Sequence, residues 1–354
     1  MTITEWESRT VRANGQRIHL RIAGSSGPMV LLCHGFPESW YSWRHQLDAL
    51  ASAGFRAVAM DMRGYGRSSK PTDVAAYRIT ELVADCVGVV EALNESTAVI
   101  IGHDFGAPVA WTAAWTRPDV FHAVVGLSLP FGGRGLAALP GNAFGETPPS
   151  VAHHALGGPD MLFYQEYFSL PGDVMANEVE KDVRKWLAAG LYSLSADRPL
   201  PPELSAVDLT SLPQDMLRQF LRGAMCVPHG STFSNLLQLP SALPRWLSEE
   251  DLEFYTSEFE RGGLIAPLNY YRNMELNWEA LGEYQGTPVT VPALFIGGDR
   301  DVATIWSQEA ASRAAENVTD LRGSVILPNC GHWIMQEQPE MVNKELLNFL
   351  HSLS

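Results

Sequence analysis

The chain of 354 residues is 46% hydrophobic and 18% charged, which is typical of a packed globule and excludes a disordered protein. Its net charge of −15, without basic clusters, argues against a nucleic-acid partner, and no apolar run is long enough to span a bilayer. The four cysteines are widely spaced and residues 1–7 are acidic and polar, so we expect reduced thiols, no signal peptide and a cytoplasmic location.

The first third of the chain alternates predicted strands and helices. Residues 16–22 alternate polar and apolar positions, which predicts a half-exposed edge strand, whereas the continuous apolar run 29–33 predicts a buried strand. Further strands are expected at 55–60, 98–101 and 123–129. Thr80 is expected to cap the helix before residue 98. Such alternation predicts an α/β fold, a doubly wound and mostly parallel sheet with helices on both faces.

The character of the sequence changes at residues 131–279. Many prolines interrupt this segment, and its amphipathic stretches are helical without any strand pattern. Strand patterns resume at 292–296 and 324–327, and a C-terminal helix follows. We therefore predict one α/β core, made of residues 1–130 and 280–354, with a helical cap domain at 131–279 that roofs the active site.

Asp104 lies at the centre of a strand–turn–helix pattern, between Gly102 and Gly106. Small residues on both sides are typical of the strained elbow that presents a nucleophile in the α/β-hydrolase fold. The usual residue at the tip is serine, but a carboxylate suits displacement at an sp³ carbon that carries a leaving group. Asp104 therefore indicates an epoxide or an alkyl halide as substrate, although acidic residues also occur at helix starts as simple caps.

Two further candidates follow predicted strands, at the sheet edge where doubly wound sheets bind ligands. Asp301 follows the strand 292–296, and His332 follows the last strand. The chain order Asp104, Asp301, His332 is the nucleophile–acid–histidine order of α/β-hydrolases. From the residues alone Asp299 is an alternative acid, because either aspartate can cap the following helix.

The tetrapeptide 34–37, His-Gly-Phe-Pro, follows the first buried strand. We expect the backbone amides of Phe36 and Phe105 to form an oxyanion hole beside the nucleophile. Pro37 is a candidate for a cis peptide bond. Pro37 and Trp333 are expected to line the substrate pocket.

These motifs resemble those of the α/β-hydrolase-fold epoxide hydrolases, especially the short bacterial members. The matching stretches cover 34–40, 61–68, 102–111, 163–168, 267–274 and 331–333. The resemblance implies conversion of an epoxide to a vicinal diol, through an ester on Asp104 that is hydrolysed by water activated by His332 and Asp301. It also implies that no metal or organic cofactor is needed. The family's two cap tyrosines fall on Tyr164 and Tyr271, whose phenols would donate to the opening ring.

Other functions stay open at this point. Haloalkane dehalogenases share the Asp elbow but hold halide with N–H donors, which the side chains of Phe36 and Phe105 lack. Fluoroacetate dehalogenases carry Arg after the nucleophile, which is absent here. A non-catalytic ligand-binding homologue would be expected to have lost a triad residue. The expected partners are a small apolar epoxide and water, and the resemblance allows a homodimer.

Overall fold

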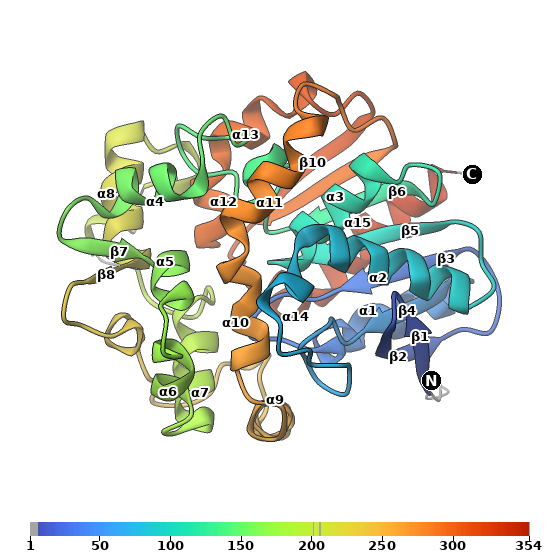
Figure 1. The fold of residues 1–354 in the computed structure, drawn as a ribbon, viewed down its shortest axis with the longest axis horizontal. Coiled ribbons are helices and arrows are strands. Elements are labelled where there is room, and N and C mark those ends of the chain that lie inside the picture. The colour runs from blue at the N-terminus through green and yellow to red at the C-terminus, as the bar shows by residue number, and fades with distance from the viewer. Residues whose placement is uncertain (1–5, 201, 205–206, 354) are drawn as a thin grey trace.

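Eight strands form one sheet in the computed structural model, which describes residues 6–200, 202–204 and 207–353 (Figure 1). In spatial order they are β1 (Glu7–Ala13), β2 (Gln16–Ala23), β4 (Arg56–Met60), β3 (Met29–Cys33), β5 (Ala98–His103), β6 (Phe121–Leu127), β9 (Ala293–Gly298) and β10 (Leu321–Leu327). β2 is antiparallel to both of its neighbours, and the pairs from β4 to β10 are all parallel. This mostly parallel sheet confirms the predicted fold class.

Helices cover both faces of the sheet. The core contains η1 (Trp40–Trp43), α1 (Arg44–Ser52), η2 (Val74–Tyr77), α2 (Ile79–Ala92), α3 (Gly106–Thr116), η7 (Leu281–Tyr284), α12 (Val302–Trp306), α13 (Gln308–Ser312), η8 (Ala314–Glu316), α14 (Ile334–Glu337) and α15 (Pro339–His351). Successive strand residues point to opposite faces. Leu31 and Ile100 therefore pack in the apolar cluster of α2 and α3, whereas Leu32 and Ile101 pack with α1 and α15.

The edge of the sheet differs from the prediction. Residues 16–22 lie in β2, which has a neighbour on each side, so they do not form an edge strand. The edge strand on this side of the sheet is β1, which pairs with β2 through a two-residue turn at Asn14 and Gly15. Both turn residues have positive φ, 46° and 72°, as expected for the Asn-Gly hairpin turn.

The prediction that Thr80 caps a helix is wrong. α2 begins one residue earlier, at Ile79, and its N-cap Arg78 makes no side-chain capping bond. The Ile79 N–H instead donates to Asn277 Oδ1 at 2.8 Å, so the cap segment supplies the acceptor.

The segment 131–279, called the cap here, is mostly helical. It contains η3 (Gly133–Gly135), α4 (Pro149–Gly157), α5 (Tyr164–Ser169), α6 (Val174–Val179), α7 (Val183–Ser193), η4 (Pro202–Leu204), η5 (Leu209–Ser211), α8 (Gln214–Met225), η6 (Phe233–Leu236), α9 (Glu249–Gly262), α10 (Ile265–Arg272) and α11 (Met274–Ala280), which ends one residue beyond it. The prediction that it has no strand is wrong, because β7 (Met161–Phe163) and β8 (Cys226–Pro228) pair antiparallel. Each has three residues, too few to show an alternating pattern.

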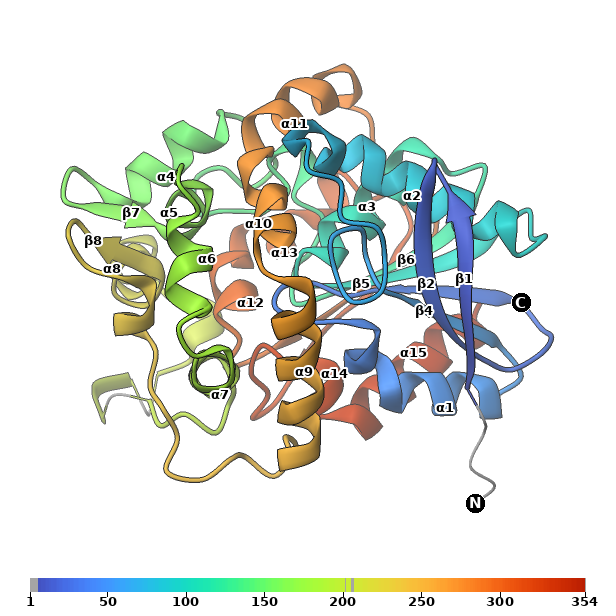
Figure 2. The same ribbon diagram turned by 60° about the horizontal axis from the view of Figure 1, so that its bottom comes forward.

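Three consecutive helices, α9, α10 and α11, run along the boundary between the other cap helices and the core (Figure 2). Polar contacts fasten this boundary, since the Tyr270 hydroxyl donates to the Arg63 carbonyl oxygen at 2.7 Å. This contact joins α10 to the segment that follows β4.

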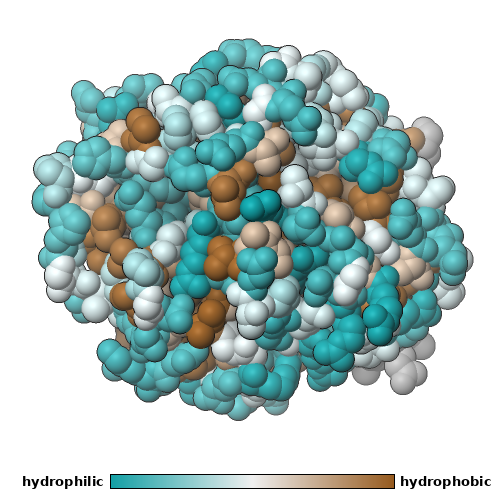
Figure 3. All heavy atoms as spheres, in the orientation of Figure 1, coloured by the Kyte–Doolittle hydropathy of each residue, from teal (hydrophilic) through white to brown (hydrophobic). Residues whose placement is uncertain are grey.

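The surface carries hydrophobic residues only in small, separate groups on the face that Figure 3 shows, surrounded by hydrophilic residues. Among the described residues, no helix is long and apolar enough to cross a membrane.

Candidate active site

Asp104 lies between the end of β5 and the start of α3, with a backbone φ of 49° in the left-handed region. The two flanking glycines allow this turn. A Cβ on Gly102 would lie 2.0 Å from the Gly106 carbonyl oxygen, and a Cβ on Gly106 would lie 2.1 Å from the Cys33 carbonyl oxygen. The local sequence thus folds into a tight elbow that places the Asp104 side chain at the carboxyl edge of the sheet.

The Asp104 carboxylate has a different partner on each oxygen. Oδ1 accepts a hydrogen bond from the Phe36 amide at 2.8 Å, and Oδ2 lies 3.3 Å from His332 Nε2. Phe105 is the N-cap residue of α3, directly after Asp104, so its amide belongs to the first turn of the helix. The Phe36–Pro37 peptide bond is cis.

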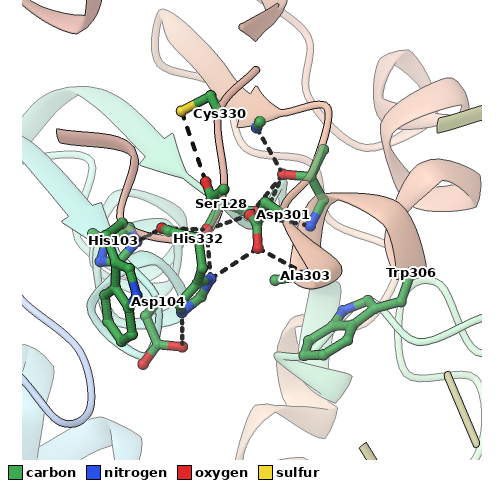
Figure 4. A network of polar contacts seen from close by, with 12 residues as sticks. His103, Asp104, Ser128, Asp301, Ala303, Trp306, Cys330 and His332 are labelled. Atoms are coloured by element: carbon green, nitrogen blue, oxygen red, sulfur yellow. Dashed lines mark hydrogen bonds and ion pairs between the residues drawn. The ribbon is translucent and has the colours of Figure 1, made fainter. Parts of the chain in front are cut away.

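His332 and Asp301 come together at the same edge (Figure 4). His332 Nδ1 lies 2.9 Å from Asp301 Oδ1, while Asp301 also accepts from the Ala303 amide as the N-cap of α12. Asp299 points elsewhere and accepts from the Cys330 amide at 3.1 Å. The geometry therefore places Asp301, and not Asp299, against the histidine.

Burial and charge act in opposite directions on this pair. Burial alone would lower the pKa of His332, but Asp301 and the hydrogen bond to Asp104 raise that pKa well above its ordinary value. Burial would likewise raise the pKa of Asp301, but His332 and two hydroxyl donors, Ser128 and Thr304, hold it below its usual range. The site thus favours a protonated imidazole between two carboxylates.

A cavity lies between the sheet edge and the cap helices. Seven of the predicted residues border it, namely Phe36, Pro37, Asp104, Tyr164, Tyr271, His332 and Trp333. The rest of the lining is mostly aromatic and aliphatic, which is typical of a pocket for a small apolar molecule.

The two predicted tyrosines enter this cavity from the cap, with ring centroids 6.0 Å apart. Burial first, and then the charge of Asp104, raise the pKa of both phenols, so they stay protonated at neutral pH. Tyr270, the neighbour of Tyr271, does not border the cavity and donates its hydroxyl to a backbone carbonyl. The structure thus separates two adjacent tyrosines that sequence spacing could not distinguish.

Residues 28–152 match the family model described as alpha/beta hydrolase fold. The chain is 48% identical to Epoxide hydrolase B of Mycobacterium tuberculosis, in a match that covers 98% of each protein. The chain belongs to the epoxide hydrolases of the α/β-hydrolase fold.

Solved structures of epoxide hydrolases are similar to this one. An epoxide hydrolase from an endophytic Streptomyces has a TM-score of 0.86 and 44% identity, covering 98% of this chain and 96% of that one. Epoxide Hydrolase A from Mycobacterium thermoresistibile has a TM-score of 0.84 and 38% identity, covering 98% of both chains.

Ser128 is one residue of this epoxide hydrolase site that sequence reasoning missed. Its hydroxyl donates to Asp301 Oδ2 at 2.5 Å and lies 3.1 Å from His332 Nδ1. It follows β6 directly and has a φ of 73°, so it stands at the same sheet edge in a strained turn. Its place after a strand was the signal that could have identified it.

A buried pair, Glu38 and His103, supports the loop that carries His332. Sequence reasoning missed this pair as well. His103 Nδ1 lies 2.7 Å from Glu38 Oε2, and His103 Nε2 lies 2.7 Å from the His332 carbonyl oxygen. Burial would raise the pKa of Glu38, but His103 lowers it to about 2. An ionised Glu38 thus orients His103 against the backbone of His332. Both residues lie in the matching stretches 34–40 and 102–111, in which the sequence assigned roles only to neighbouring residues.

Glu337 also holds the loop that carries His332, through hydrogen bonds from the loop's backbone amides. Its carboxylate accepts from the Gly331 amide at 2.9 Å and the Trp333 amide at 3.0 Å, which flank His332 in the sequence. It also accepts from the Ala196 amide of the cap at 2.9 Å. Burial raises the pKa of Glu337 to about 7. No pattern in the sequence pointed to this buried carboxylate.

A metal site was not expected for this epoxide hydrolase. Within residues 6–200, 202–204 and 207–353, no group of three or more His, Cys, Asp or Glu side chains could hold a metal ion.

Proposed function

We propose that this chain hydrolyses small apolar epoxides to vicinal diols through a covalent ester on Asp104. The observation that carries the proposal is the placement of the Asp104 carboxylate at an apolar cavity into which two protonated phenols, Tyr164 and Tyr271, enter from the cap. The relatives named epoxide hydrolase support it, because they match along the whole chain.

In the first step, an Asp104 carboxylate oxygen attacks a ring carbon and the carbon–oxygen bond of the epoxide breaks. Negative charge then develops on the ring oxygen, and Tyr164 and Tyr271 donate hydrogen bonds, and one proton, to it. The carboxylate is already ionised and needs no general base for this attack.

In the second step, His332 activates a water molecule that attacks Cγ of the ester. Alkylation neutralises Asp104, which removes one of the interactions that raise the pKa of His332. The imidazole can then release its proton and accept one from water. The Phe36 amide, which holds Oδ1 at 2.8 Å, and the Phe105 amide stabilise the oxyanion.

The bond from Cγ to the substrate oxygen then breaks, and His332 gives the proton taken from water to the leaving alkoxide. The carboxyl proton of the regenerated Asp104 passes to His332, and the proton that the imidazole released earlier reaches the phenolate through solvent. The net reaction therefore adds one water to one epoxide.

Haloalkane dehalogenase activity is the second candidate, because several indole rings border the cavity. Two of these indoles are committed elsewhere, since Trp306 donates to the Ala137 carbonyl oxygen and Trp333 to that of Leu191. The third, Trp186, has a buried Nε1 without a hydrogen-bond partner among the described residues. Two of the three N–H groups are therefore committed to backbone carbonyls and are not free to hold a halide.

The deciding experiment incubates the enzyme with matched panels of epoxides and haloalkanes and measures diol and halide separately. Diol from apolar epoxides, unaffected by EDTA, is the expected result. Halide release without diol from any epoxide would contradict the proposal, and loss of activity in EDTA that a metal restores would contradict the cofactor-free reaction.

A further inference from the structure

The Tyr164 hydroxyl has a protein partner that the Tyr271 hydroxyl lacks. Gln165 Nε2 donates to Tyr164 Oη at 3.0 Å, within a buried part of α5. Among the residues that the structure describes, Tyr271 makes ring contacts but no hydrogen bond through its hydroxyl. A phenol oxygen that accepts one N–H still carries its own proton, which is then free for a second acceptor. The Tyr164 proton is therefore available to an acceptor in the cavity that Tyr164 borders.

The opposite end of the Gln165 amide faces a histidine. Gln165 Oε1 and His153 Nε2 are both buried without a partner at hydrogen-bond geometry. Both residues also border a second pocket. Burial lowers the pKa of His153 to about 4, although the nearby Gln165 amide acts to raise it. His153 is thus neutral at neutral pH and keeps one ring N–H. If that N–H faces Oε1, the amide must present Nε2 to Tyr164, as observed.

We propose that Gln165 is a positioning residue that aims the Tyr164 proton at the epoxide oxygen and makes Tyr164 the principal proton donor of the two phenols. This inference rests on the proposed function, because it concerns the ring-opening step. As the phenol gives up its proton, charge develops on Oη and the bond from Gln165 strengthens. Burial and the charge of Asp104 raise the pKa of both phenols, and only for Tyr164 does a hydrogen bond, from Gln165, oppose this rise.

The test compares Gln165→Met, which keeps the size of the side chain but cannot donate, with Gln165→Glu. An ionised Glu can only accept, so it would draw the Tyr164 proton away from the cavity. Rapid-quench intact-mass measurements with styrene oxide give the rate of Asp104 alkylation and the rate of ester hydrolysis separately. Alkylation should fall about tenfold in Gln165→Met, the loss of a hydrogen bond that strengthens by about 1.4 kcal/mol in the transition state, and further in Gln165→Glu.

Matched backgrounds separate positioning from packing. In Tyr271→Phe the Gln165→Met change should still slow alkylation about tenfold, whereas in Tyr164→Phe it should change the rate less than about twofold. Ester hydrolysis should stay within about twofold of wild type in every case, and circular dichroism checks the fold. Equal slowing in both backgrounds, equal slowing of both steps, or a wild-type alkylation rate in Gln165→Met or Gln165→Glu would overturn the role of Gln165.

Failure of the proposed function would look different. If the wild-type enzyme forms no Asp104 adduct with styrene oxide or any other epoxide of the panel, the covalent ester itself is refuted. If the wild type forms the adduct and the Gln165 variants match its rate, only the positioning role is refuted.

Discussion

His332 Nε2 lies 3.3 Å from Asp104 Oδ2, close enough to serve the ester that would form on that carboxylate. Because ring opening needs no base, His332→Gln should still be alkylated once and then stall. Intact-mass measurement of the variant with an epoxide should show one substrate mass added and a turnover rate reduced by about 10²–10⁴. An unmodified variant that demonstrably binds substrate would contradict the two-step reaction.

The two aspartates of the β9 loop should differ strongly when each is changed to Asn. Asp301→Asn removes the charge 2.9 Å from His332 Nδ1, so ester hydrolysis should fall by about 10²–10⁴. Asp299→Asn, whose carboxylate only accepts from the Cys330 amide, is the matched control and should lose less than about tenfold. Single-turnover hydrolysis rates measure both, and the reverse ranking would show that Asp299 is the acid.

The cap phenols should matter together more than singly. Removing one donor aimed at developing charge costs about 10²–10³ in rate, and the remaining phenol can partly substitute. Tyr164→Phe and Tyr271→Phe should therefore each slow Asp104 alkylation less than the double variant, which should leave almost no ring opening. Circular dichroism verifies folding. Near wild-type alkylation in the double variant would make both tyrosines ordinary packing residues.

Glu337 should make the free energy of unfolding depend on pH. Its pKa is about 7 in the folded protein against 4.5 ordinarily, so between these values the folded state holds a proton that the unfolded state has lost. The stabilisation that this bound proton gives the folded state is complete below pH 4.5 and is lost as the pH rises through 7. The free energy of unfolding of the wild type, relative to that of Glu337→Gln, should thus fall as the pH rises, by on the order of 3 kcal/mol. A difference that stays constant from about pH 4 to 8 would count against this assignment.

Local patterns explain which parts of the structure could be predicted. The buried strands are continuous apolar runs, and the elbow at Asp104 needs glycines at fixed offsets, so both can be identified within a few residues. The Asn14-Gly15 turn was equally local, and weighing it would have identified β1 and corrected the edge.

The residues that escaped prediction depend on partners far away in the chain. Ser128 is separated from Asp301 by 173 positions, and Ala196 from Glu337 by 141. The true acceptor for the Ile79 amide, Asn277, lies 198 positions away, so Thr80 was the only nearby candidate. Such contacts form only when the cap and both halves of the core are in place, and short-range periodicity carries no information about them.

The unequal surroundings of the two Asp104 oxygens have a consequence for the fate of individual atoms. The Phe36 amide holds Oδ1 while Oδ2 faces His332, and in the proposed reaction water attacks Cγ rather than the substrate carbon. The oxygen that leaves with the diol therefore comes from the protein, and solvent replaces it. In heavy-oxygen water a single turnover should yield an unlabelled diol and a heavier Asp104 peptide, so each molecule of enzyme keeps an isotopic record of its first reaction.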